Sequence, residues 1–412
     1  MRNQKTLGST FYIKTFGCQM NVRDSEVICG LLKNEGYEFT EEANTADIVL
    51  FNTCSVRQHA EDKVWSEIGR VAKMSPPDLA RKTFQIKAGE TPRPMKKIIG
   101  LVGCMAQNYK ESIFERTPNV DFVVGPSDIQ KIPLIILSFL KTRGQSPKQG
   151  DSPLVQRKIW ETDGGIRPEE IYHTGFYEDK EHAYVVISEG CSNFCSYCVV
   201  PYVRGGLHNR NYKDILKEIE EAVNTGITKI TLLGQNVNAY SCELTAHSSQ
   251  INFVELLKLV NDIKGVKEFS FVTSHPKDTS FDLFKAMADL EKLKKCLHLP
   301  IQSGSDRILK LMNRGYTHKF YLDLVKNYRK IVKDAVLTTD IILGFPSEKE
   351  EDFQDTYNLV KDIQFNSAFI FKYSVRPNTE AAKLVDDVAR EEKERRHGLI
   401  LELQKKISRN KK

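Results

Sequence analysis

The 412-residue sequence has no apolar run that approaches the roughly 20 residues needed to cross a bilayer. Its first residues, Met1–Lys5, lead into a strand-like segment and not into the apolar core of a signal peptide. These absences predict a cytoplasmic protein with no membrane partner, and we expect it to be a monomer. Hydrophobic residues make up 40% of the chain, which suffices for a large core and excludes a disordered protein.

The chain also lacks a strong excess of either charge. It carries 60 Lys and Arg against 54 Asp and Glu, a net charge of +6, which is mild for a nucleic-acid-binding protein. The excess is concentrated between Val388 and Lys412, where nine basic residues accompany four Glu. Such a tail can contact phosphate, but it is also typical of a solvated helix end, and the sequence leaves both interpretations open.

A disulfide framework is disfavoured because the nine cysteines are odd in number and no secretion signal accompanies them. Metal binding or redox chemistry is the better starting hypothesis. Cys29 lies on the apolar face of a helical pattern and Cys296 begins an apolar strand pattern, so both are predicted to be core residues. Cys242 lies in a polar loop and suggests no role.

Three segments in the first third of the chain share one form, an apolar run that ends in a small-residue turn with a cysteine. The runs at 11–17, 47–53 and 98–103 end at Cys18, Cys54 and Cys104, and helical patterns at 24–34 and 57–73 lie between them. This alternation predicts a parallel, Rossmann-like α/β domain over residues 8–140. Ligands of such sheets bind outside the carboxyl ends of the strands, so three distant cysteines can converge there.

Residues 76–94 are rich in Pro and charge and predict an insertion loop, and residues 141–179 predict an interdomain linker. Strand and helix patterns then alternate over residues 180–387. The six strand patterns lie at 183–188, 227–233, 268–274, 296–301, 336–343 and 367–373. They predict an open (β/α)6 partial TIM barrel with its chemistry at the carboxyl ends of the strands. Residues 388–412 predict a final basic helix.

The first barrel strand leads into a Cys-x3-Cys-x2-Cys loop formed by Cys191, Cys195 and Cys198. Three thiolates in one short loop can bind three irons of a 4Fe-4S cluster and leave the fourth iron open for chemistry. A closed zinc site is the alternative, but it needs four ligands, and only His208 is near enough in sequence to complete such a set.

This loop resembles that of the radical S-adenosylmethionine (SAM) superfamily, in which SAM chelates the open iron and is cleaved to a 5′-deoxyadenosyl radical. The segments 15–21, 52–57 and 103–107 look like the N-terminal signature of the methylthiotransferases, in particular of the MiaB-type tRNA methylthiotransferases. The resemblance covers about residues 10 to 405, and its further motifs lie at 198–205, 233–240, 312–316 and 340–346.

The resemblance implies two 4Fe-4S clusters, an auxiliary one on Cys18, Cys54 and Cys104 and a SAM-binding one on Cys191, Cys195 and Cys198. One SAM would methylate sulfur carried at the auxiliary cluster, and a second would supply the radical that removes hydrogen from C2 of an adenosine. Since this C2–H is neither acidic nor electrophilic, acid-base groups cannot activate it. The product would be 2-methylthio-N6-isopentenyladenosine beside the anticodon of tRNA, with a flavodoxin- or ferredoxin-like protein as electron donor.

Two other readings stay open at this point. One is a methylthiotransferase that acts on threonylcarbamoyladenosine of tRNA or on an aspartate of a ribosomal protein. Those groups typically carry Lys-Val-Asn or Pro-Lys-Asn after the first cysteine, where this chain has Gln19-Met20-Asn21. The other is a catalytically idle RNA-binding relative.

Polar residues near the ends of the predicted barrel strands are candidates for binding SAM or substrate. They are Tyr197, the aromatic residue before the third cysteine, and Gln235, Asn236, Ser274, Gln302, Arg314 and Gly344. His275 and His298 could line the same cleft, but structural histidines with satisfied hydrogen bonds are the favoured interpretation for both.

The chain departs from the family pattern in three places. Residues 206–211 replace an acidic residue and a Ser-Arg-Pro, and only Arg210 matches. Ser347 stands where the family has the second glycine of Gly-Phe-Pro-Gly-Glu. The β-barrel RNA-binding module called TRAM usually follows the last helix, whereas this sequence stops at Lys412, so we expect RNA affinity from the barrel mouth and the basic tail.

Overall fold

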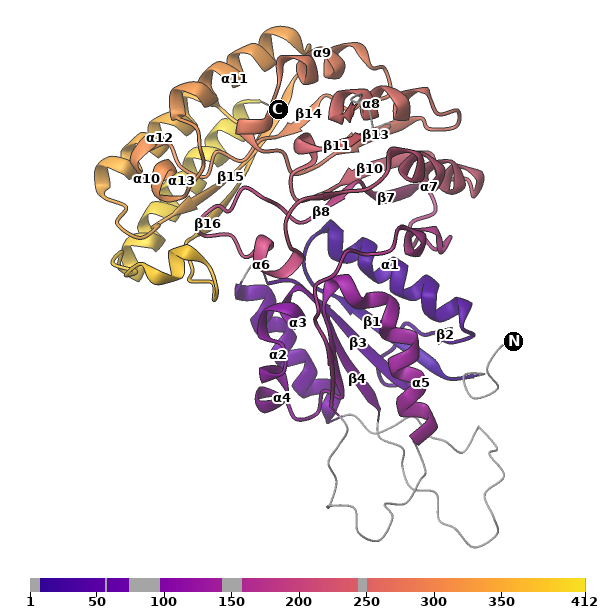
Figure 1. Ribbon diagram of the computed structural model, residues 1–412. Helices are drawn as coiled ribbons and strands as arrows, with labels where there is room; N and C mark the ends of the chain where they lie inside the picture. Colours follow the sequence, from indigo (N-terminus) through magenta and orange to yellow (C-terminus); the bar gives the residue numbers. More distant parts are fainter. Residues whose placement is uncertain (1–7, 56–57, 74–96, 143–157, 244–249, 412) are drawn as a thin grey trace, which may run out of the picture. The chain divides into compact units, whose positions relative to one another are not determined.

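The computed structural model describes residues 8–55, 58–73, 97–142, 158–243 and 250–411 (Figure 1). The chain divides into two compact units, Met1–Glu178 and Asp179–Lys412. The predicted insertion loop at 76–94 lies outside the described residues.

The first unit is built on one six-stranded parallel sheet with the order β2-β1-β3-β4-β5-β6. The strands are β1 (Thr10–Thr15), β2 (Glu38–Phe39), β3 (Ile48–Thr53), β4 (Ile98–Gly103), β5 (Phe122–Val124) and β6 (Ile159–Glu161). Every residue of β3 and β4 is buried, as in a sheet with helices on both faces. The predicted parallel α/β domain is confirmed. Its strand order is that of flavodoxin-type sheets, in which the order of the parallel strands changes direction between β1 and β3.

Helices cover both faces of this sheet (Figure 1). The helices are α1 (Gln19–Asn34), α2 (Gln58–Ala72), α3 (Cys104–Tyr109), α4 (Ser112–Arg116) and α5 (Ile132–Thr142), with short 3-10 turns at Pro126–Lys131 and Glu169–His173. α1 and α5 lie on one face, and α2, α3 and α4 lie on the other, where Val64 and Ile68 pack against Phe51 and Leu101. The core therefore sits on both sides of β3 and β4.

The predicted linker at 141–179 is wrong for residues 158–178, which belong to the first unit. β6 pairs with β5 as the last strand of the sheet, and the buried Arg167 donates hydrogen bonds to Asp24 (2.7 Å) and to the Pro126 carbonyl (2.9 Å). No local sequence pattern could show this, because the strand has three residues and its anchoring ion pair joins positions 143 residues apart. The first domain thus extends beyond residue 140.

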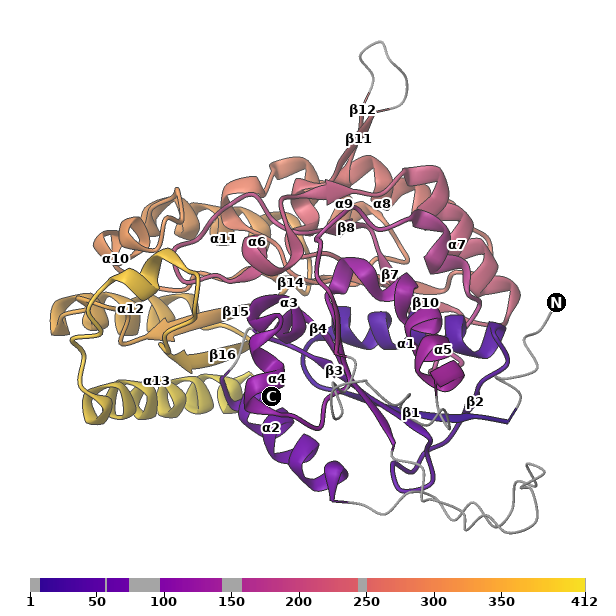
Figure 2. The ribbon, with the colours of Figure 1, turned by 60° about the horizontal axis from the view of Figure 1, so that its bottom comes forward.

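The second unit contains the six predicted parallel strands in two three-stranded sheets, β7-β10-β13 and β14-β15-β16, each in sequence order (Figure 2). The strands are β7 (His182–Val186), β10 (Lys229–Leu233), β13 (Glu268–Phe271), β14 (Cys296–His298), β15 (Val336–Leu343) and β16 (Ser367–Lys372). An isolated parallel bridge pairs Phe269 of β13 with Leu293, which lies shortly before β14 in sequence. The predicted partial barrel is confirmed in this form.

Helices alternate with these strands, and several of them begin at residues that cap them. They are α6 (Val200–Arg204), α7 (Tyr212–Asn224), α8 (Phe253–Asp262), α9 (Phe281–Asp289), α10 (Asp306–Leu311), α11 (His318–Ile331), α12 (Glu350–Ile363) and α13 (Arg390–Asn410). Asn252 and Glu255 form a reciprocal capping box at α8, and Ser280 and Thr317 cap α9 and α11. Every helix that the structure describes is too short or too polar to span a bilayer.

Two short antiparallel pairs accompany the barrel. β8 (Ser188–Glu189) pairs with β9 (His208–Asn209). β11 (Ser241–Glu243) and β12 (Gln250–Asn252) form a hairpin that projects from the helices (Figure 2), and Cys242 lies on its first strand and not in a loop. Cys29 is buried as predicted, whereas Cys296 is only half-buried at the start of β14.

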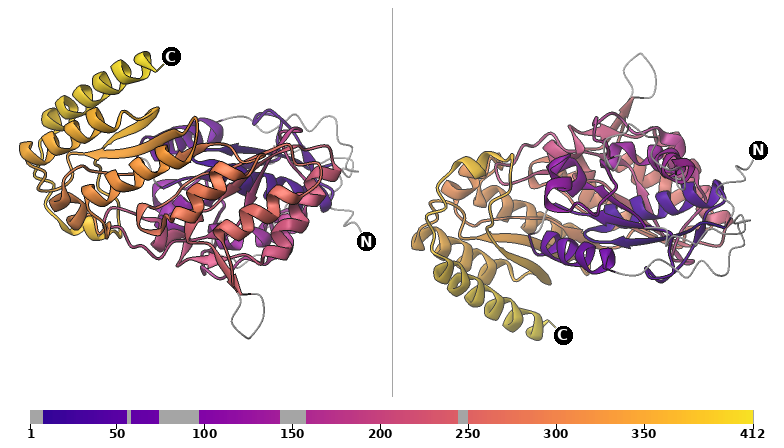
Figure 3. Two further views of the ribbon diagram at one scale, coloured as in Figure 1. Left: turned by 90° about the horizontal axis from the view of Figure 1, so that it is seen from above. Right: turned by 90° about the horizontal axis from the view of Figure 1, so that it is seen from below.

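The last helix, α13, packs against β16 and α12 at the edge of the barrel (Figure 3). Lys393 and Arg396 are buried, and they pair with Asp386 (2.5 Å) and Glu348 (2.7 Å). The cations in this helix that form ion pairs are Arg390, Lys393, Arg395, Arg396 and Lys406. Because Lys393 and Arg396 are buried against carboxylates of the same unit, these two cations serve the fold. For the exposed cations of the basic tail, the RNA contact stays a prediction.

The tight packing of β4 against β5 makes a stability prediction. A Cβ on Gly100 would meet Phe122 Cζ at 2.3 Å and Leu50 Cδ2 at 2.9 Å. We expect Gly100→Ala to lower the free energy of unfolding by about 1–3 kcal/mol through overpacking. The matched control is Gly69→Ala in α2, where no atom lies within 4 Å and the same substitution should stabilise by about 0.5–1 kcal/mol. Equal effects of the two substitutions in denaturant unfolding would contradict this packing.

Candidate metal centres and polar cleft

Backbone hydrogen bonds shape the cysteine loop between β8 and α6. The Cys191 N–H donates to the Gly205 carbonyl (3.1 Å), the Ser196 N–H donates to the Met312 carbonyl (3.0 Å), and the Cys198 N–H donates to the Cys195 carbonyl (2.9 Å). These bonds attach the loop to the segments at Gly205 and at Met312. The positions of its three cysteines therefore do not depend on a movement of neighbouring helices.

The segment that departs from the family pattern still supports this loop. Gly190 has φ +69°, and a Cβ there would meet the Gly206 carbonyl oxygen at 2.1 Å, so the two backbones approach as closely as glycine permits. Arg210 is buried and donates to the Val186 carbonyl (2.6 Å) and to Glu218 (2.5 Å). Because support comes from backbone and from the matching Arg210, the changed side chains leave it intact.

Two thiols of this loop, those of Cys191 and Cys198, are hard to ionise unaided. Burial raises the pKa of the Cys191 thiol, and burial together with the nearby Cys195 raises the pKa of Cys198 to about 12. Arg314, 5% exposed, donates from Nη1 to Cys195 Sγ (3.3 Å) and from Nη2 to the Pro300 carbonyl (2.9 Å). A bound metal deprotonates such thiols through its own charge, so this environment fits metal ligands better than free thiolates.

The closed zinc site is disfavoured by the spacing of the ligand atoms. Within the described part of the chain, the group whose ligand atoms all lie within 4.8 Å of one another is Asp128, Glu161 and Asp163, and Lys131 pairs with all three. Neither cysteine set forms such a group, with or without His208. Three thiols that lie farther apart than the ligands of a single ion can instead bind a polynuclear iron-sulfur cluster.

Buried polar atoms without hydrogen-bond partners gather at the carboxyl ends of the barrel strands. In the described residues they include Ser188 Oγ, Gln235 Oε1, Asn236 Oδ1, Ser274 Oγ, His275 Nε2 and Gln302 Oε1. They follow β7, β10, β13 and β14, and each unmet hydrogen bond costs about 1–3 kcal/mol. This pattern fits a polar ligand rich in donors and acceptors, as SAM is. Four of the atoms belong to predicted site residues, Gln235, Asn236, Ser274 and Gln302.

Hydrogen bonds connect these strand ends with the cysteine loop. Asn236 Nδ2 donates to Asp278 (2.7 Å), and Arg314 Nη1 lies 3.4 Å from the Tyr197 hydroxyl and donates to it. His275 is not satisfied as predicted: its Nδ1 accepts from the Lys277 N–H (3.2 Å), but its Nε2 has no partner, and burial lowers its pKa to about 2. The imidazole is therefore neutral and can hydrogen-bond a ligand.

His298 is satisfied, as predicted. Its Nδ1 lies 2.9 Å from Thr338 Oγ1 and its Nε2 lies 3.3 Å from Asp340 Oδ2. It belongs to the strand pairing of β14 with β15.

The contacts that support Gly344 could not be predicted from the sequence. Gly344 has φ +69°, and its N–H donates to Glu348 Oε1 (2.9 Å), which also accepts from Arg396 of α13 (2.7 Å). A Cβ on Gly344 would meet Lys393 Cγ at 2.3 Å. The last helix therefore fixes the turn at the end of β15, a contact that sequence spacing does not reveal.

The first unit brings Cys18, Cys54 and Cys104 to one edge of its sheet. Cys54 and Cys104 directly follow Thr53 and Gly103, which are paired in β3 and β4. A Cβ on Gly17 would meet Cys54 Cβ at 2.4 Å, so the turn before Cys18 lies against Cys54. This is the edge where the strand order reverses, and ligands bind there in such sheets.

Two buried asparagines that are not among the predicted site residues fix this edge. Asn21 Nδ2 donates to Asn52 Oδ1 (3.0 Å) and to the Thr53 carbonyl (3.0 Å), and Asn52 Nδ2 donates to the Asn21 carbonyl (2.8 Å). Both residues stand inside the quoted cysteine motifs. The signal available in the sequence was an amide side chain within three residues of a candidate ligand, because such groups often orient metal ligands.

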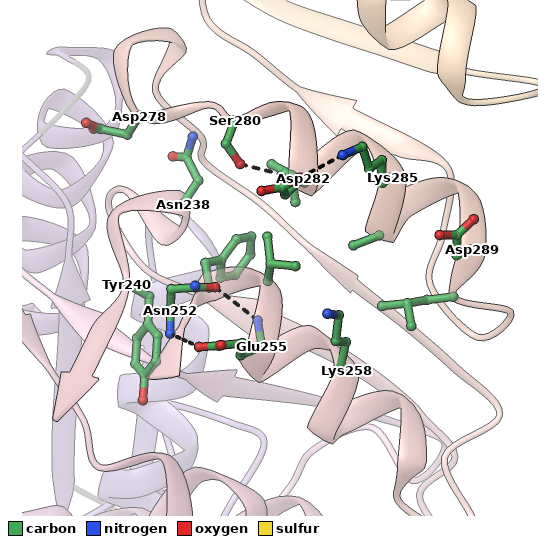
Figure 4. Close-up of a pocket in the computed structure, with 15 residues that line it drawn as sticks. Asn238, Tyr240, Asn252, Glu255, Lys258, Asp278, Ser280, Asp282, Lys285 and Asp289 are labelled. Atoms are coloured by element: carbon green, nitrogen blue, oxygen red, sulfur yellow. Dashed lines mark hydrogen bonds and ion pairs between the residues drawn. The ribbon is translucent and has the colours of Figure 1, made fainter. Parts of the chain in front are cut away.

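A cavity of about 630 Å³ lies between α8 and α9 (Figure 4). Its polar walls are already paired: Asn252 with Glu255 in the capping box, and Lys285 with Asp282 (3.1 Å). No cysteine lines it, so we do not place the reaction there.

Two family models match the two parts of the chain. Residues 185–360 match the radical SAM superfamily, and residues 10–125 match the uncharacterized protein family UPF0004. A tRNA-2-methylthio-N(6)-dimethylallyladenosine synthase of Thermoanaerobacter sp. (strain X514) is 42% identical over 400 residues, which cover 97% of this chain and 78% of that one. One from Clostridium novyi (strain NT) is 43% identical over 397 residues, 95% of this chain and 80% of that one.

Solved structures show the same fold at low identity. The radical S-adenosylmethionine methyltransferase TsrM from Kitasatospora setae has 12% identity and a TM-score of 0.55, over 91% of this chain and 74% of that one. The cobalamin-dependent S-adenosylmethionine radical enzyme OxsB has 12% identity and a TM-score of 0.53, over 98% and 56%.

The partial barrel and its three-cysteine loop thus define a radical SAM enzyme. Within that superfamily, the chain belongs to the MiaB-type tRNA methylthiotransferases, the family of the tRNA-2-methylthio-N(6)-dimethylallyladenosine synthases.

The serine in place of the family's glycine makes a second stability prediction. Ser347 has φ +68°, a left-handed conformation that costs a residue with a Cβ about 1 kcal/mol. We expect Ser347→Gly to raise the free energy of unfolding by about 0.5–1 kcal/mol. The control is Ser280→Gly, a helix cap with φ −106°, which should lose a few tenths of a kcal/mol. A loss of stability in Ser347→Gly would refute the strained turn.

Proposed function

We propose that this enzyme transfers a methylthio group to C2 of N6-isopentenyladenosine beside the anticodon of tRNA. The observation that carries the proposal is the placing of two sets of three thiols. Cys18, Cys54 and Cys104 follow β1, β3 and β4 of one parallel sheet, and the other three share one loop between β8 and α6. Neither set has ligand atoms that all lie within 4.8 Å of one another. Relatives named as synthases of this product, 40% to 43% identical to the chain, support it.

Cys191, Cys195 and Cys198 would hold the SAM-binding 4Fe-4S cluster. When bound, this cluster and SAM supply a 5′-deoxyadenosyl radical. Arg314 places its guanidinium against the Cys195 sulfur (3.3 Å) and excludes water from that side, because it is itself 5% exposed. The unpartnered atoms of Gln235, Ser274 and others at the strand ends would bind the polar groups of SAM.

Three further residues would orient SAM in that cleft. Tyr197 stands beside Arg314, where its ring packs on the buried cluster of Met312 and Phe345. The neutral His275 offers Nε2 as a hydrogen-bonding atom. Gly344 forms the turn at the end of β15, and its N–H donates a hydrogen bond to Glu348 Oε1.

Cys18, Cys54 and Cys104 would hold the auxiliary 4Fe-4S cluster. Cys18 occupies the N-cap position of α1, where the helix N-terminus favours a thiolate, while Cys54 and Cys104 are 3% and 5% exposed. The Asn21–Asn52 pair keeps the ends of β1 and β3 in place, so the three sulfurs are presented without a change in the sheet.

Iron content tests the two ligand sets. Anaerobically reconstituted protein should bind about eight irons per chain, and Cys54→Ala and Cys191→Ala should each lower this to about four. Cys29→Ala is the matched control, since Cys29 is a buried core thiol whose pKa is raised to about 12 by burial. Eight irons in either ligand variant, or a loss in the control, would contradict the assignment.

Nucleoside composition tests the reaction. In a bacterial strain that lacks its own enzyme, the chain should convert isopentenyladenosine of tRNA to the 2-methylthio form, and Cys191→Ala should not. Mass spectrometry of digested tRNA measures both nucleosides. Methylthiolation of threonylcarbamoyladenosine instead would establish the other substrate class, and unchanged tRNA with full clusters would favour the idle relative.

A further inference from the structure

The cysteine loop exposes an aromatic ring directly beside a proposed ligand. Phe194 precedes Cys195 and is 50% exposed. Tyr202 of α6 is 40% exposed and meets Phe194 edge to face, with ring centroids 6.5 Å apart and an interplanar angle of 81°. We call these two residues the aromatic pair.

The backbone at Phe194 is strained in a way that a mere loop does not require. Its φ is +47°, which is a genuine outlier for a bulky residue. Asn313 fixes this conformation, because its Nδ2 donates to the Phe194 carbonyl (3.0 Å) and to the Asn193 carbonyl (3.4 Å). Strain that neighbouring residues actively hold is typical of functional positions.

A cation stands next to the aromatic pair. Lys277 is exposed, and its Nζ donates to Asn193 Oδ1 (2.8 Å), the residue before Phe194. The same Asn193 donates from Nδ2 to Asp278 (3.5 Å), so the loop and the end of β13 are connected. An exposed aromatic surface with an adjacent cation is suited to binding unpaired RNA, because bases stack on aromatic rings and phosphates bind lysine.

We infer that the aromatic pair is a stacking surface for a nucleobase of the unpaired anticodon loop, with Lys277 at a neighbouring phosphate. The inference rests on the proposed function. The reacting adenosine must approach the loop that carries Cys195, so the nucleotides beside it meet the exposed groups of that loop. A docking site for the electron donor is the competing use of this surface. It is disfavoured because such encounters depend mainly on complementary charge, and this surface is largely aromatic.

Binding of a fluorescent anticodon stem-loop RNA to the full, anaerobically reconstituted chain tests the inference. Phe194→Ala should raise the Kd roughly tenfold, since stacking of one base contributes that order of affinity. Phe194→Tyr keeps the ring and should bind like the parent protein. Phe281→Ala is the matched control, because Phe281 of α9 is 51% exposed and lies outside the cysteine loop.

Two further measurements sharpen the test. Because the rings touch, the losses in Phe194→Ala and Tyr202→Ala should be less than additive in the double variant. Lys277→Ala should reduce the slope of log Kd against log salt by about 1, as for one lost phosphate contact. Iron per chain is measured for every variant.

The inference is overturned if Phe194→Ala binds RNA as the parent does, or if its loss of binding follows a loss of iron. Unchanged RNA binding with slower reduction by flavodoxin would assign the surface to the electron donor. Failure of the proposed function looks different: the parent protein would bind the RNA through the aromatic pair and still leave its isopentenyladenosine unmodified.

Discussion

Parallel strand pairing is the constraint on which both candidate centres depend. In a parallel sheet all carboxyl ends lie at one edge, so residues distant in sequence meet there without any long-range recognition of their own. In the first unit, the register that pairs Thr53 with Gly103 sets Cys54 beside Cys104. In the second unit the same arrangement collects the unpartnered polar atoms after β7, β10, β13 and β14. The chemistry of this enzyme is therefore a property of strand ends.

Features encoded by local pattern were predictable from the sequence. The six barrel strands and the three cysteine-terminated strands of the first unit are continuous apolar runs, and each is found where its run lies. The six candidate ligand cysteines stand out by their spacing or by their place after such runs. Gln235, Asn236, Ser274 and Gln302 could be chosen as site residues because they follow barrel strands, and the structure leaves all four with unmet hydrogen bonds.

Features encoded by long-range contacts were not predictable. β6 was assigned to a linker because three residues carry no period, and its place depends on pairing with β5 and on the buried Arg167–Asp24 ion pair. The basic tail was a candidate RNA contact because charge was counted without partners. In the structure Arg396 and Lys393 are buried against Glu348 and Asp386, and α13 supports the turn at Gly344. Counting charge along a sequence cannot separate cations that bind a ligand from cations that close a fold.

Left-handed backbone at non-glycine residues also occurs near the candidate active site. Among the described residues of the second unit, the non-glycine residues with left-handed backbone are Phe194, Thr273, Gln302, Asn313, Asp334, Ser347, Gln364 and Asn378. Phe194 lies in the cysteine loop, Thr273 and Gln302 follow β13 and β14, and Ser347 follows β15. A sheet of regular strands has no need of strain at its ends, and each such residue costs stability that the core must offset. Asp334 and Gln364 instead precede β15 and β16, so such backbone is not confined to one edge. At the carboxyl ends it coincides with the unmet hydrogen bonds, as expected for a site that positions cofactor and substrate.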